Sequence, residues 1–364
     1  MIKKYDCIQT IKSVQNKSMK TIVFTGGGTA GHIMPNVALF PEAEKVFDKI
    51  VYIGSNKMEK EILKKFPTID FYEIPCVKLV RKLTSKNLLI PFKLIQSVSQ
   101  TKKILKKINP SVIFSKGGYV SLPVVIASKQ LNIPVISHES DITMGLANKI
   151  IYRYSNLMLT SFETTAKGKK NCQFVGSPIR ESIFHGNKNN LKLNLNEKPT
   201  ILIFGGSLGS KKINGIVEKS IDQLCKDFFV IHLTGKGKKT NIENKNYYQQ
   251  EFASNIEDFF DASDIVVSRG GANALFELLA LKKPTLIIPL SKSESRGDQI
   301  DNANYFAQKG FAKVLLEEEL SPSSFISSIK NLYQNKQQLI KNMASAENSF
   351  PNKKIVDIIL KNSK

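Results

Sequence analysis

A glycine-rich turn at residues 25–35 (TGGGTAGHIMP) constrains the fold of this chain more than any other feature. It follows an apolar run at 21–24 that predicts a buried strand, and it precedes a segment, 32–47, whose apolar spacing predicts a helix. A strand, a glycine turn and a helix in this order can bind an anion, because free backbone N–H groups at the helix start face the ligand. The sequence therefore predicts an α/β fold with a ligand at the end of this strand.

The glycines of this turn also fit the G-x-G-x-x-G pattern of dinucleotide-binding folds. That interpretation requires an acidic residue at the end of the second strand, where it would hold a ribose. The predicted second strand, 50–53, is followed by Gly54-Ser55-Asn56, and no acid occurs before Glu59. We therefore expect no nicotinamide or flavin cofactor.

Short apolar runs alternate with helical patterns through the first half of the chain. The predicted strands are 21–25, 50–53, 69–74, 111–115, 133–137 and 157–160, and the predicted helices are 32–47, 57–66, 88–107, 121–131 and 145–154. This alternation indicates a parallel sheet with helices on both faces and with ligands beyond the carboxyl ends of the strands.

The same pattern starts again after a break near 176–178 and a polar stretch at 185–199. The order of strand, glycine turn and helix is repeated here, with a strand at 200–204, a second glycine turn at 205–209 and a helix at 211–226. Further strands are predicted near 229–233, 264–267 and 285–289. We therefore expect two similar nucleotide-binding domains that face each other across a cleft. The last segment, about 321–362, is predicted to be helical and to cross back to the first domain.

The net charge of +22 suggests a polyanionic partner, which is a nucleic acid, an anionic membrane or a phosphorylated substrate. A general bias toward lysine is the alternative. Residues 77–107 combine Leu, Ile and Phe with many lysines, as in an amphipathic segment at a membrane surface, although an ordinary surface helix has the same pattern. No apolar run approaches the roughly 20 residues of a membrane-spanning helix.

Two further features limit the class of protein. The four cysteines are far apart and form no C-x-x-C, so neither structural zinc nor a disulfide framework is expected. A basic nucleic-acid-binding protein would explain the charge, but no basic and aromatic recognition motif is present and the chain has no Trp.

Candidate catalytic residues lie in two loops of the first half. His32 directly follows the first glycine turn, where imidazole can act as a base near neutral pH; a helix-terminal residue bonded to the backbone is the alternative. His138, Glu139 and Asp141 follow the strand at 133–137 and either face the same cleft or cap the next helix. The segment is not H-E-x-x-H, because residue 142 is Ile, so zinc is not expected.

Candidate ligands for a nucleotide sugar lie in the second half. Small residues at 270–274 open a helix whose N-terminus can accept a diphosphate, and Glu277 is placed to bind a ribose diol, unless it is a solvated helix acid. Gln299 and Asn302 are candidates for binding sugar hydroxyls. No D-x-D pair follows a strand, so the helix dipole and basic side chains, rather than a metal, would neutralise the diphosphate.

Seven motifs in order carry a resemblance to a known family: GGGTAGHIMP, SKGGYVSLP, HESDITMGLANK, VGSPIR, FGGSLGSKKIN, SRGGANALFE and SRGDQIDNA. From about residue 20 to 340 the chain resembles glycosyltransferase family 28, and within it the enzymes that convert lipid I to lipid II in peptidoglycan synthesis. The resemblance implies the GT-B fold, two Rossmann-like domains with the catalytic cleft between them. The expected parts are a disordered extension at 1–18, an acceptor and membrane-side domain at 19–178, a UDP-sugar domain at 179–340 and a C-terminal helix at 341–364.

The resemblance also implies an inverting transfer of N-acetylglucosamine from UDP-N-acetylglucosamine to the C4 hydroxyl of the muramyl sugar of lipid I. His32 would be the base, with Glu139 or His138 assisting. The residues that would bind the nucleotide sugar are Thr29, Ala30, Gly31, Asp141, Arg180, Ser207, Ala272, Asn273, Glu277 and Gln299. Among them, Arg180 and Ser207 would hold the diphosphate. Asp141 stands where the family more often has asparagine, so its role is less firmly implied. Ala30 replaces a glycine that is common at that turn position.

The implied partners are UDP-N-acetylglucosamine, lipid I and an anionic membrane surface, with no cofactor, metal or nucleic acid. The implied location is peripheral, on the cytoplasmic face of the cell membrane. Two alternatives share the fold: a related UDP-sugar transferase that acts on another lipid, such as diacylglycerol, and a UDP-sugar epimerase. An epimerase needs no lipid-facing segment and no acceptor.

Overall fold

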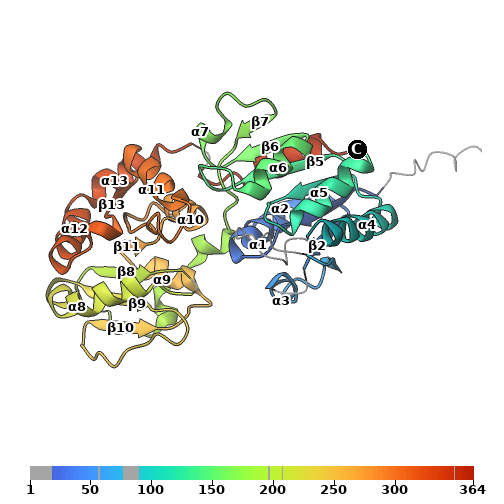
Figure 1. Ribbon diagram of the computed structural model, residues 1–364. Coiled ribbons are helices and arrows are strands. Elements are labelled where there is room, and N and C mark those ends of the chain that lie inside the picture. The colour runs from blue at the N-terminus through green and yellow to red at the C-terminus, as the bar shows by residue number, and fades with distance from the viewer. Residues whose placement is uncertain (1–18, 56–57, 77–89, 196, 207, 348) are drawn as a thin grey trace, which may run out of the picture.

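The computed structural model describes residues 19–55, 58–76, 90–195, 197–206, 208–347 and 349–364. They form two α/β halves that lie side by side, each built on one parallel sheet (Figure 1). The expected extension at 1–18 lies outside the described residues.

The first half contains a seven-stranded sheet in the order β3-β2-β1-β4-β5-β6-β7, and all neighbouring strands are parallel. Its strands are β1 (Thr21–Thr25), β2 (Lys49–Gly54), β3 (Asp70–Glu73), β4 (Val112–Ser115), β5 (Val135–Glu139), β6 (Leu157–Thr160) and β7 (Cys172–Phe174). Its helices are α1 (Ala30–Val37), α2 (Phe40–Glu44), α3 (Met58–Leu63), α4 (Ile90–Ile108), α5 (Ser121–Gln130), α6 (Leu146–Tyr154) and α7 (Glu163–Ala166).

The second half contains a six-stranded parallel sheet in the order β10-β9-β8-β11-β12-β13. Its strands are β8 (Thr200–Phe204), β9 (Phe229–Leu233), β10 (Tyr247–Gln250), β11 (Ile265–Ser268), β12 (Thr285–Ile287) and β13 (Ala312–Val314). The helices are α8 (Lys211–Asp227), α9 (Ile256–Ala262), α10 (Ala272–Ala280), α11 (Asp298–Gln308), α12 (Pro322–Gln334), α13 (Lys336–Ala344) and α14 (Asn352–Lys361). Short 3₁₀ helices span Glu181–His185, Lys188–Leu191 and Glu317–Glu319.

Side chains of β1 alternate between the two faces of the first sheet, as strand geometry requires. Ile22 and Phe24 are fully buried in a core with residues of α1, α2 and α14, whereas Val23 is buried in a second core with α4, α5 and α6. The predicted cover of helices on both faces is therefore confirmed for this sheet.

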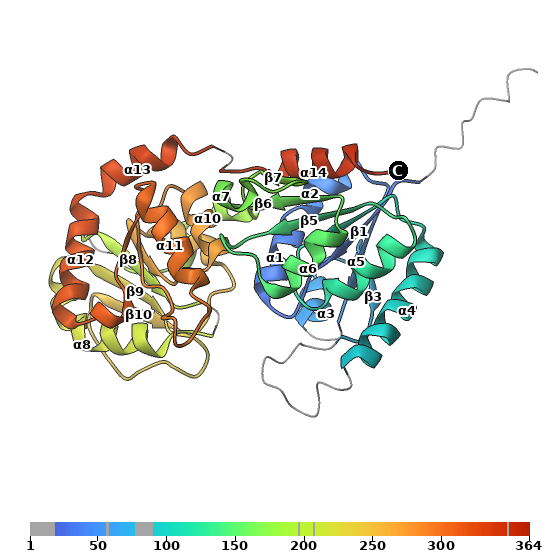
Figure 2. The ribbon, with the colours of Figure 1, turned by 45° about the horizontal axis from the view of Figure 1, so that its top comes forward.

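The last helix belongs to the core of the first half. Ile355, Val356 and Ile359 of α14 pack in the same cluster as Ile22 and Phe24 of β1. Figure 2 shows the chain passing from α13 on the second half to α14 on the first. The two halves are thus joined twice, by the segment after β7 and by the segment before α14.

Two sequence predictions about secondary structure were wrong. The single helix predicted at 32–47 is two helices, α1 and α2, since Pro41 in the first turn of α2 has no N–H to continue an α-helical ladder from α1. The prediction also missed β7, β10 and β13, each of three or four residues at the edge of a sheet. Edge strands are only partly buried, so their sequences lack the continuous apolar run of the central strands.

The amphipathic segment predicted at 77–107 is described only from residue 90 onward, where α4 begins; residues 77–89 lie outside the described part. Ser97, Thr101 and Leu105 of α4 are buried, whereas Phe92 and Ile95 are 72% and 66% exposed. No helix in the described ranges is long and apolar enough to cross a membrane.

Candidate active site

Two asparagines of the second half hold loops of the first half. Asn273, at the start of α10, donates from Nδ2 to the carbonyl of Gly31 (2.8 Å) and accepts at Oδ1 from the hydroxyl of Ser140 (2.9 Å). Asn302 of α11 donates to Asp141 Oδ1 (3.1 Å) and accepts from the backbone N–H of Ile142 (3.0 Å). These bonds bring the first glycine turn, the loop after β5 and the start of α10 together at one site.

Three predicted sugar ligands therefore have protein partners in this site: Gly31, Asp141 and Asn273. Burial raises the pKa of Asp141, and the hydrogen bond from Asn302 works in the opposite direction. The sequence had named Asn302 as a candidate for sugar binding, but here its amide joins the two halves.

His32 lies in the first turn of α1 and contacts the loop after β4. Its Nδ1 is 3.0 Å from the hydroxyl of Thr29, and a Cβ at Gly118 would lie only 3.3 Å from the same nitrogen. Burial lowers the pKa of His32 to about 4, and the positive charges of Lys116 and Arg296 act in the same direction. The imidazole is therefore neutral at neutral pH and can accept a proton.

A buried lysine underlies this site. The Nζ of Lys116, which is 1% exposed, lies 2.8 Å from Nδ1 of His138 and also contacts the hydroxyl of Ser140. Burial lowers the pKa of Lys116 to about 8, and the charges of Glu139 and Asp141 oppose this shift. Lys116 was included in the sequence analysis only within the motif SKGGYVSLP and was given no role, because its partners come from a different strand.

His138 and Glu139 are both held by the protein. His138 is also bonded through Nε2 to the carbonyl of Gly176 (2.9 Å), and burial together with Lys116 lowers its pKa well below the usual value. Glu139 accepts from the N–H groups of Asp141 (3.0 Å) and Gly145 (3.2 Å), and from Asn148 Nδ2 (2.9 Å). The contacts of Glu139 are those of a residue that orders the loop after β5.

In the second half, two predicted ligands are paired with each other. Arg180 donates from Nε and Nη2 to Glu277 Oε1 and Oε2, at 2.7 and 3.0 Å. Burial works against the charged guanidinium, but the hydrogen bonds that it donates to Glu277 raise the pKa of Arg180. The sequence had given these residues separate roles, on the diphosphate and on the ribose.

A pocket of about 410 Å³ lies between the second glycine turn, the start of α8 and the start of α10. Gly271, the N-cap residue of α10, and Ala274 within that helix line the pocket, and Lys211 and Lys212 line it from α8. Gln299 also lines it, with its Oε1 accepting from the N–H groups of Gly270 (3.2 Å) and Leu290 (3.1 Å). Ala272 begins α10, so its N–H belongs to the first turn; Ser207, predicted to hold the diphosphate, lies outside the described residues.

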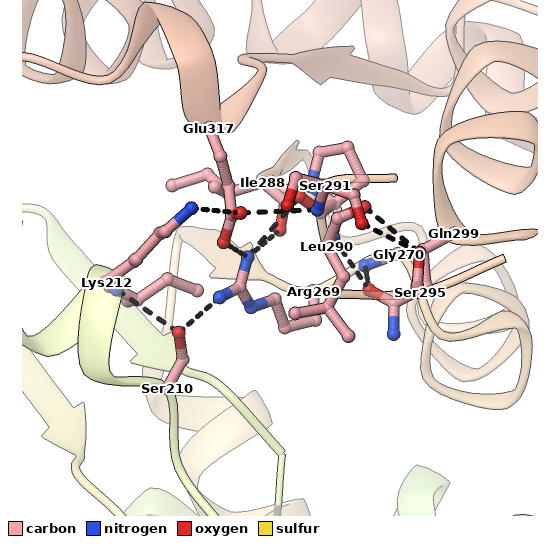
Figure 3. A network of polar contacts seen from close by, with 12 residues as sticks. Ser210, Lys212, Arg269, Gly270, Ile288, Leu290, Ser291, Ser295, Gln299 and Glu317 are labelled. Atoms are coloured by element: carbon pink, nitrogen blue, oxygen red, sulfur yellow. Dashed lines mark hydrogen bonds and ion pairs between the residues drawn. The ribbon is translucent and has the colours of Figure 1, made fainter. Parts of the chain in front are cut away.

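An ion network around the buried carboxylate of Glu317 joins the start of α8 to the segments that follow β11 and β12 (Figure 3). Arg269 donates to Glu317 Oε1 (2.6 Å), to the carbonyl of Ile288 (3.1 Å) and to the hydroxyl of Ser210 (2.5 Å). Lys212 donates to the other carboxylate oxygen of Glu317 (2.7 Å). The sequence prediction missed this network, since Arg269 and Glu317 are 48 positions apart and no motif joins them.

Within the described part of the chain, no group of three or more His, Cys, Asp or Glu side chains is placed to hold a metal ion.

Comparison with known proteins identifies the family. Residues 22–160 match the N-terminal domain of glycosyltransferase family 28, and residues 200–359 match its C-terminal domain. A curated relative from Clostridium botulinum (strain 657 / Type Ba4) is 46% identical over 95% of this chain and 100% of its own length. The chain belongs to glycosyltransferase family 28.

That relative is named UDP-N-acetylglucosamine–N-acetylmuramyl-(pentapeptide) pyrophosphoryl-undecaprenol N-acetylglucosamine transferase. A relative with the same name from Staphylococcus aureus (strain MRSA252) is 42% identical over 95% of this family 28 chain and 99% of its own length.

Solved structures agree on the fold. MurG from Acinetobacter baumannii superposes with a TM-score of 0.74 at 22% identity, over 94% of this chain and 99% of that one. UDP-GlcNAc 2-epimerase from Neisseria meningitidis superposes with a TM-score of 0.67 at 14% identity, over 94% and 99%. The predicted GT-B arrangement of two Rossmann-like domains is confirmed for this family 28 chain.

Proposed function

We propose that this family 28 glycosyltransferase transfers N-acetylglucosamine from UDP-N-acetylglucosamine to the muramyl sugar of lipid I, and so forms lipid II. The observation that carries the proposal is the bond from Asn273 to Gly31, because it joins the start of α10 to the residue next to His32. A nucleotide sugar bound at α10 would then face the proposed base. The names of the relatives at 42% and 46% identity support the choice of substrates.

The donor would bind mainly to the second half. The first N–H groups of α10, at Ala272 and Asn273, are positioned for a diphosphate at a helix N-terminus. Glu277 can bind ribose hydroxyls while it stays bonded to Arg180, because a carboxylate has about four acceptor positions. Arg180 would thus orient Glu277 and add positive charge near the diphosphate.

The sugar would lie between the halves. The two N–H groups that bond Gln299 Oε1 fix the orientation of its side-chain amide, so that Nε2 is the atom available to an N-acetylglucosamine hydroxyl. Ser207 on the second glycine turn, and Thr29, Ala30, Gly31 and Asp141 on the first half, are proposed as the remaining contacts. The bonds of Asn273 and Asn302 to the first half would have to adjust to admit the sugar.

The reaction would be a single inverting displacement. The C4 hydroxyl of the muramyl sugar gives its proton to neutral His32 while its oxygen bonds to C1 of N-acetylglucosamine. The bond from C1 to the phosphate oxygen breaks, and UDP leaves with the electron pair. The N–H groups of α10 face the charge that develops on the diphosphate, and such preorganised donors supply several kcal/mol. Glu139 would act by ordering the loop after β5, with His138 fixed against Lys116.

A transfer assay tests the function directly. The purified protein is incubated with UDP-N-acetylglucosamine labelled in the sugar, with and without a lipid I analogue. We expect label in a lipid-linked disaccharide only when the analogue is present. Epimerisation of UDP-N-acetylglucosamine without acceptor would show instead that the shared fold serves the epimerase reaction.

Replacing Glu277 with alanine is expected to raise KM for UDP-N-acetylglucosamine about 10- to 100-fold, because a hydrogen bond to a charged group contributes about 1.5–3 kcal/mol. KM for the lipid I analogue should change little. Steady-state kinetics with each substrate varied in turn makes the measurement, and Glu218→Ala, an exposed acid on α8, is the control. Equal increases in both KM values would argue against a ribose contact.

We also propose that the protein binds an anionic membrane surface through α4. Phe92 and Ile95 project from this helix with little cover, and Lys93, Lys103, Lys106 and Lys107 are exposed on it. Apolar side chains enter the lipid interface while lysines attract anionic headgroups. This surface would place the cytoplasmic face of the membrane, and lipid I in it, next to the first half.

The double substitution Phe92→Ser with Ile95→Ser is expected to weaken binding to phosphatidylglycerol vesicles at least about tenfold, because each large apolar side chain contributes roughly 1.5–3 kcal/mol when buried. Vesicle co-sedimentation measures this, and activity on a water-soluble lipid I analogue should stay unchanged. The control is Phe350→Ser, an exposed aromatic residue outside α4. Undiminished sedimentation of the double variant would rule out α4 as the docking surface.

A further inference from the structure

A carboxylate of the protein itself occupies the first glycine turn. The sequence predicted that N–H groups of this turn would be free for an anion. Instead, the N–H of Gly28 donates to Oε1 of Glu59 at 2.9 Å. Ser55 donates from its hydroxyl to Oε2 at 2.9 Å, and Glu59 is 0% exposed. The anion at Gly28 is therefore a side chain from α3.

The glycines of the turn leave space for this carboxylate. A Cβ at Gly27 would lie 1.8 Å from Oε1 of Glu59, so any side chain there would displace the carboxylate. A Cβ at Gly28 would lie 2.3 Å from Cε1 of Tyr119, and Gly28 has a φ of +87°, which L side chains rarely adopt. The turn therefore lies in close contact with both Glu59 and Tyr119.

The held turn leads directly into the proposed base. Thr29 follows Gly28 and caps α1, and its carbonyl accepts the N–H of His32 at 3.1 Å. The hydroxyl of Thr29 lies 3.0 Å from Nδ1 of His32, so a shift of Gly28 would move both groups that orient the imidazole. Proton transfer requires an imidazole nitrogen of His32 within hydrogen-bond distance of the acceptor sugar's hydroxyl. Small displacements of the imidazole therefore lower the rate of transfer.

We propose that Glu59 is a positioning residue for this reaction: its buried carboxylate takes the place of a bound anion at the first glycine turn and fixes the turn that carries Thr29 and His32. The inference rests on the proposed function. It also explains why the diphosphate is bound by the second half, since a phosphate at Gly28 would meet the carboxylate of Glu59.

The test compares Glu59→Ala and Glu59→Gln with the wild-type protein in the transfer assay. We expect Glu59→Ala to lower kcat about 10- to 100-fold, with KM for UDP-N-acetylglucosamine within about twofold of the wild-type value. Added formate should restore part of kcat, because a small carboxylate can refill the space and accept the N–H of Gly28. Glu59→Gln should lose less, since the amide oxygen can accept the same bond.

Glu61→Ala is the matched control, because Glu61 lies on the same helix but is exposed and paired with Lys64. It should leave kcat unchanged and show no response to formate.

The outcomes distinguish a failure of the proposed function from a failure of the role of Glu59. If the wild-type protein makes no lipid-linked disaccharide, the proposed function fails. If it does, and Glu59→Ala keeps the wild-type kcat, the role of Glu59 is refuted, and a parallel rise in KM for the nucleotide sugar would refute it too. If Glu59→Ala does not fold, Glu59→Asp decides, because its carboxylate is one methylene shorter and is drawn back from the N–H of Gly28: a lowered kcat at unchanged KM supports positioning, and a wild-type kcat overturns it.

Discussion

Replacing His32 with alanine is expected to lower kcat for sugar transfer about 10²- to 10⁴-fold, the usual contribution of a general base. The site accounts for an effect of this size: the imidazole is kept neutral by burial and by the charges of Lys116 and Arg296, and the other two candidate bases, His138 and Glu139, are held by their own partners. Steady-state kinetics on a lipid I analogue gives kcat, and calorimetry should show that UDP-N-acetylglucosamine still binds.

The control for this prediction is His185→Ala, which removes an exposed histidine of a 3₁₀ helix and should leave kcat unchanged. The pH profile supplies a second check. Because the pKa of His32 is lowered to about 4, its basic form persists as the pH falls below 6.5 and is lost only near pH 4. An unimpaired rate in His32→Ala would remove this residue from the mechanism.

Glu317→Ala is expected to lower the free energy of unfolding by about 3–5 kcal/mol, as when one partner of a buried ion pair is removed. Arg269, 9% exposed, would lose its carboxylate and remain buried, and Lys212 and the N–H of Ser291 would lose the same acceptor. Although burial opposes the charge of Glu317, the bonds from Lys212 and Arg269 lower its pKa, so it is ionised at neutral pH.

Urea denaturation measures this decrease in the free energy of unfolding. Glu318→Ala is the control, because Glu318 is the exposed neighbour in the same 3₁₀ helix.

The network also anchors Ser210, which caps α8 at the edge of the pocket, so the affinity of Glu317→Ala for UDP-N-acetylglucosamine should fall as well. Indistinguishable stabilities for the two variants would show that the ion network contributes nothing.

Sequence alone predicted the parts of the fold that depend on local patterns. The strands 21–25 and 200–204 were predicted at the residues that form β1 and β8, because buried central strands are continuous apolar runs bounded by glycine turns. The edge strands β7, β10 and β13 were missed, since they depend on pairing with a distant neighbour rather than on their own sequence.

Side-chain partners across the molecule were the least predictable part of the site. Arg180 and Glu277 were each identified as ligands, but their mutual bond joins residues 97 positions apart. Glu59 was mentioned in the sequence analysis only as an acid too far beyond the second strand to bind a ribose. Its hydrogen bond with Gly28 of the first glycine turn depends on how α3 packs against that turn. Such contacts follow from tertiary packing, which local patterns do not specify.

In the proposed mechanism, the nucleotide sugar is bound at the start of α10 while His32 faces the acceptor hydroxyl. A crystal structure of the protein with UDP-N-acetylglucosamine tests it most directly. We expect the diphosphate on the N–H groups of Ala272 and Asn273, the ribose on Glu277, and the anomeric carbon of the sugar turned toward His32. A nucleotide bound at the first glycine turn, or a sugar turned away from His32, would contradict the account.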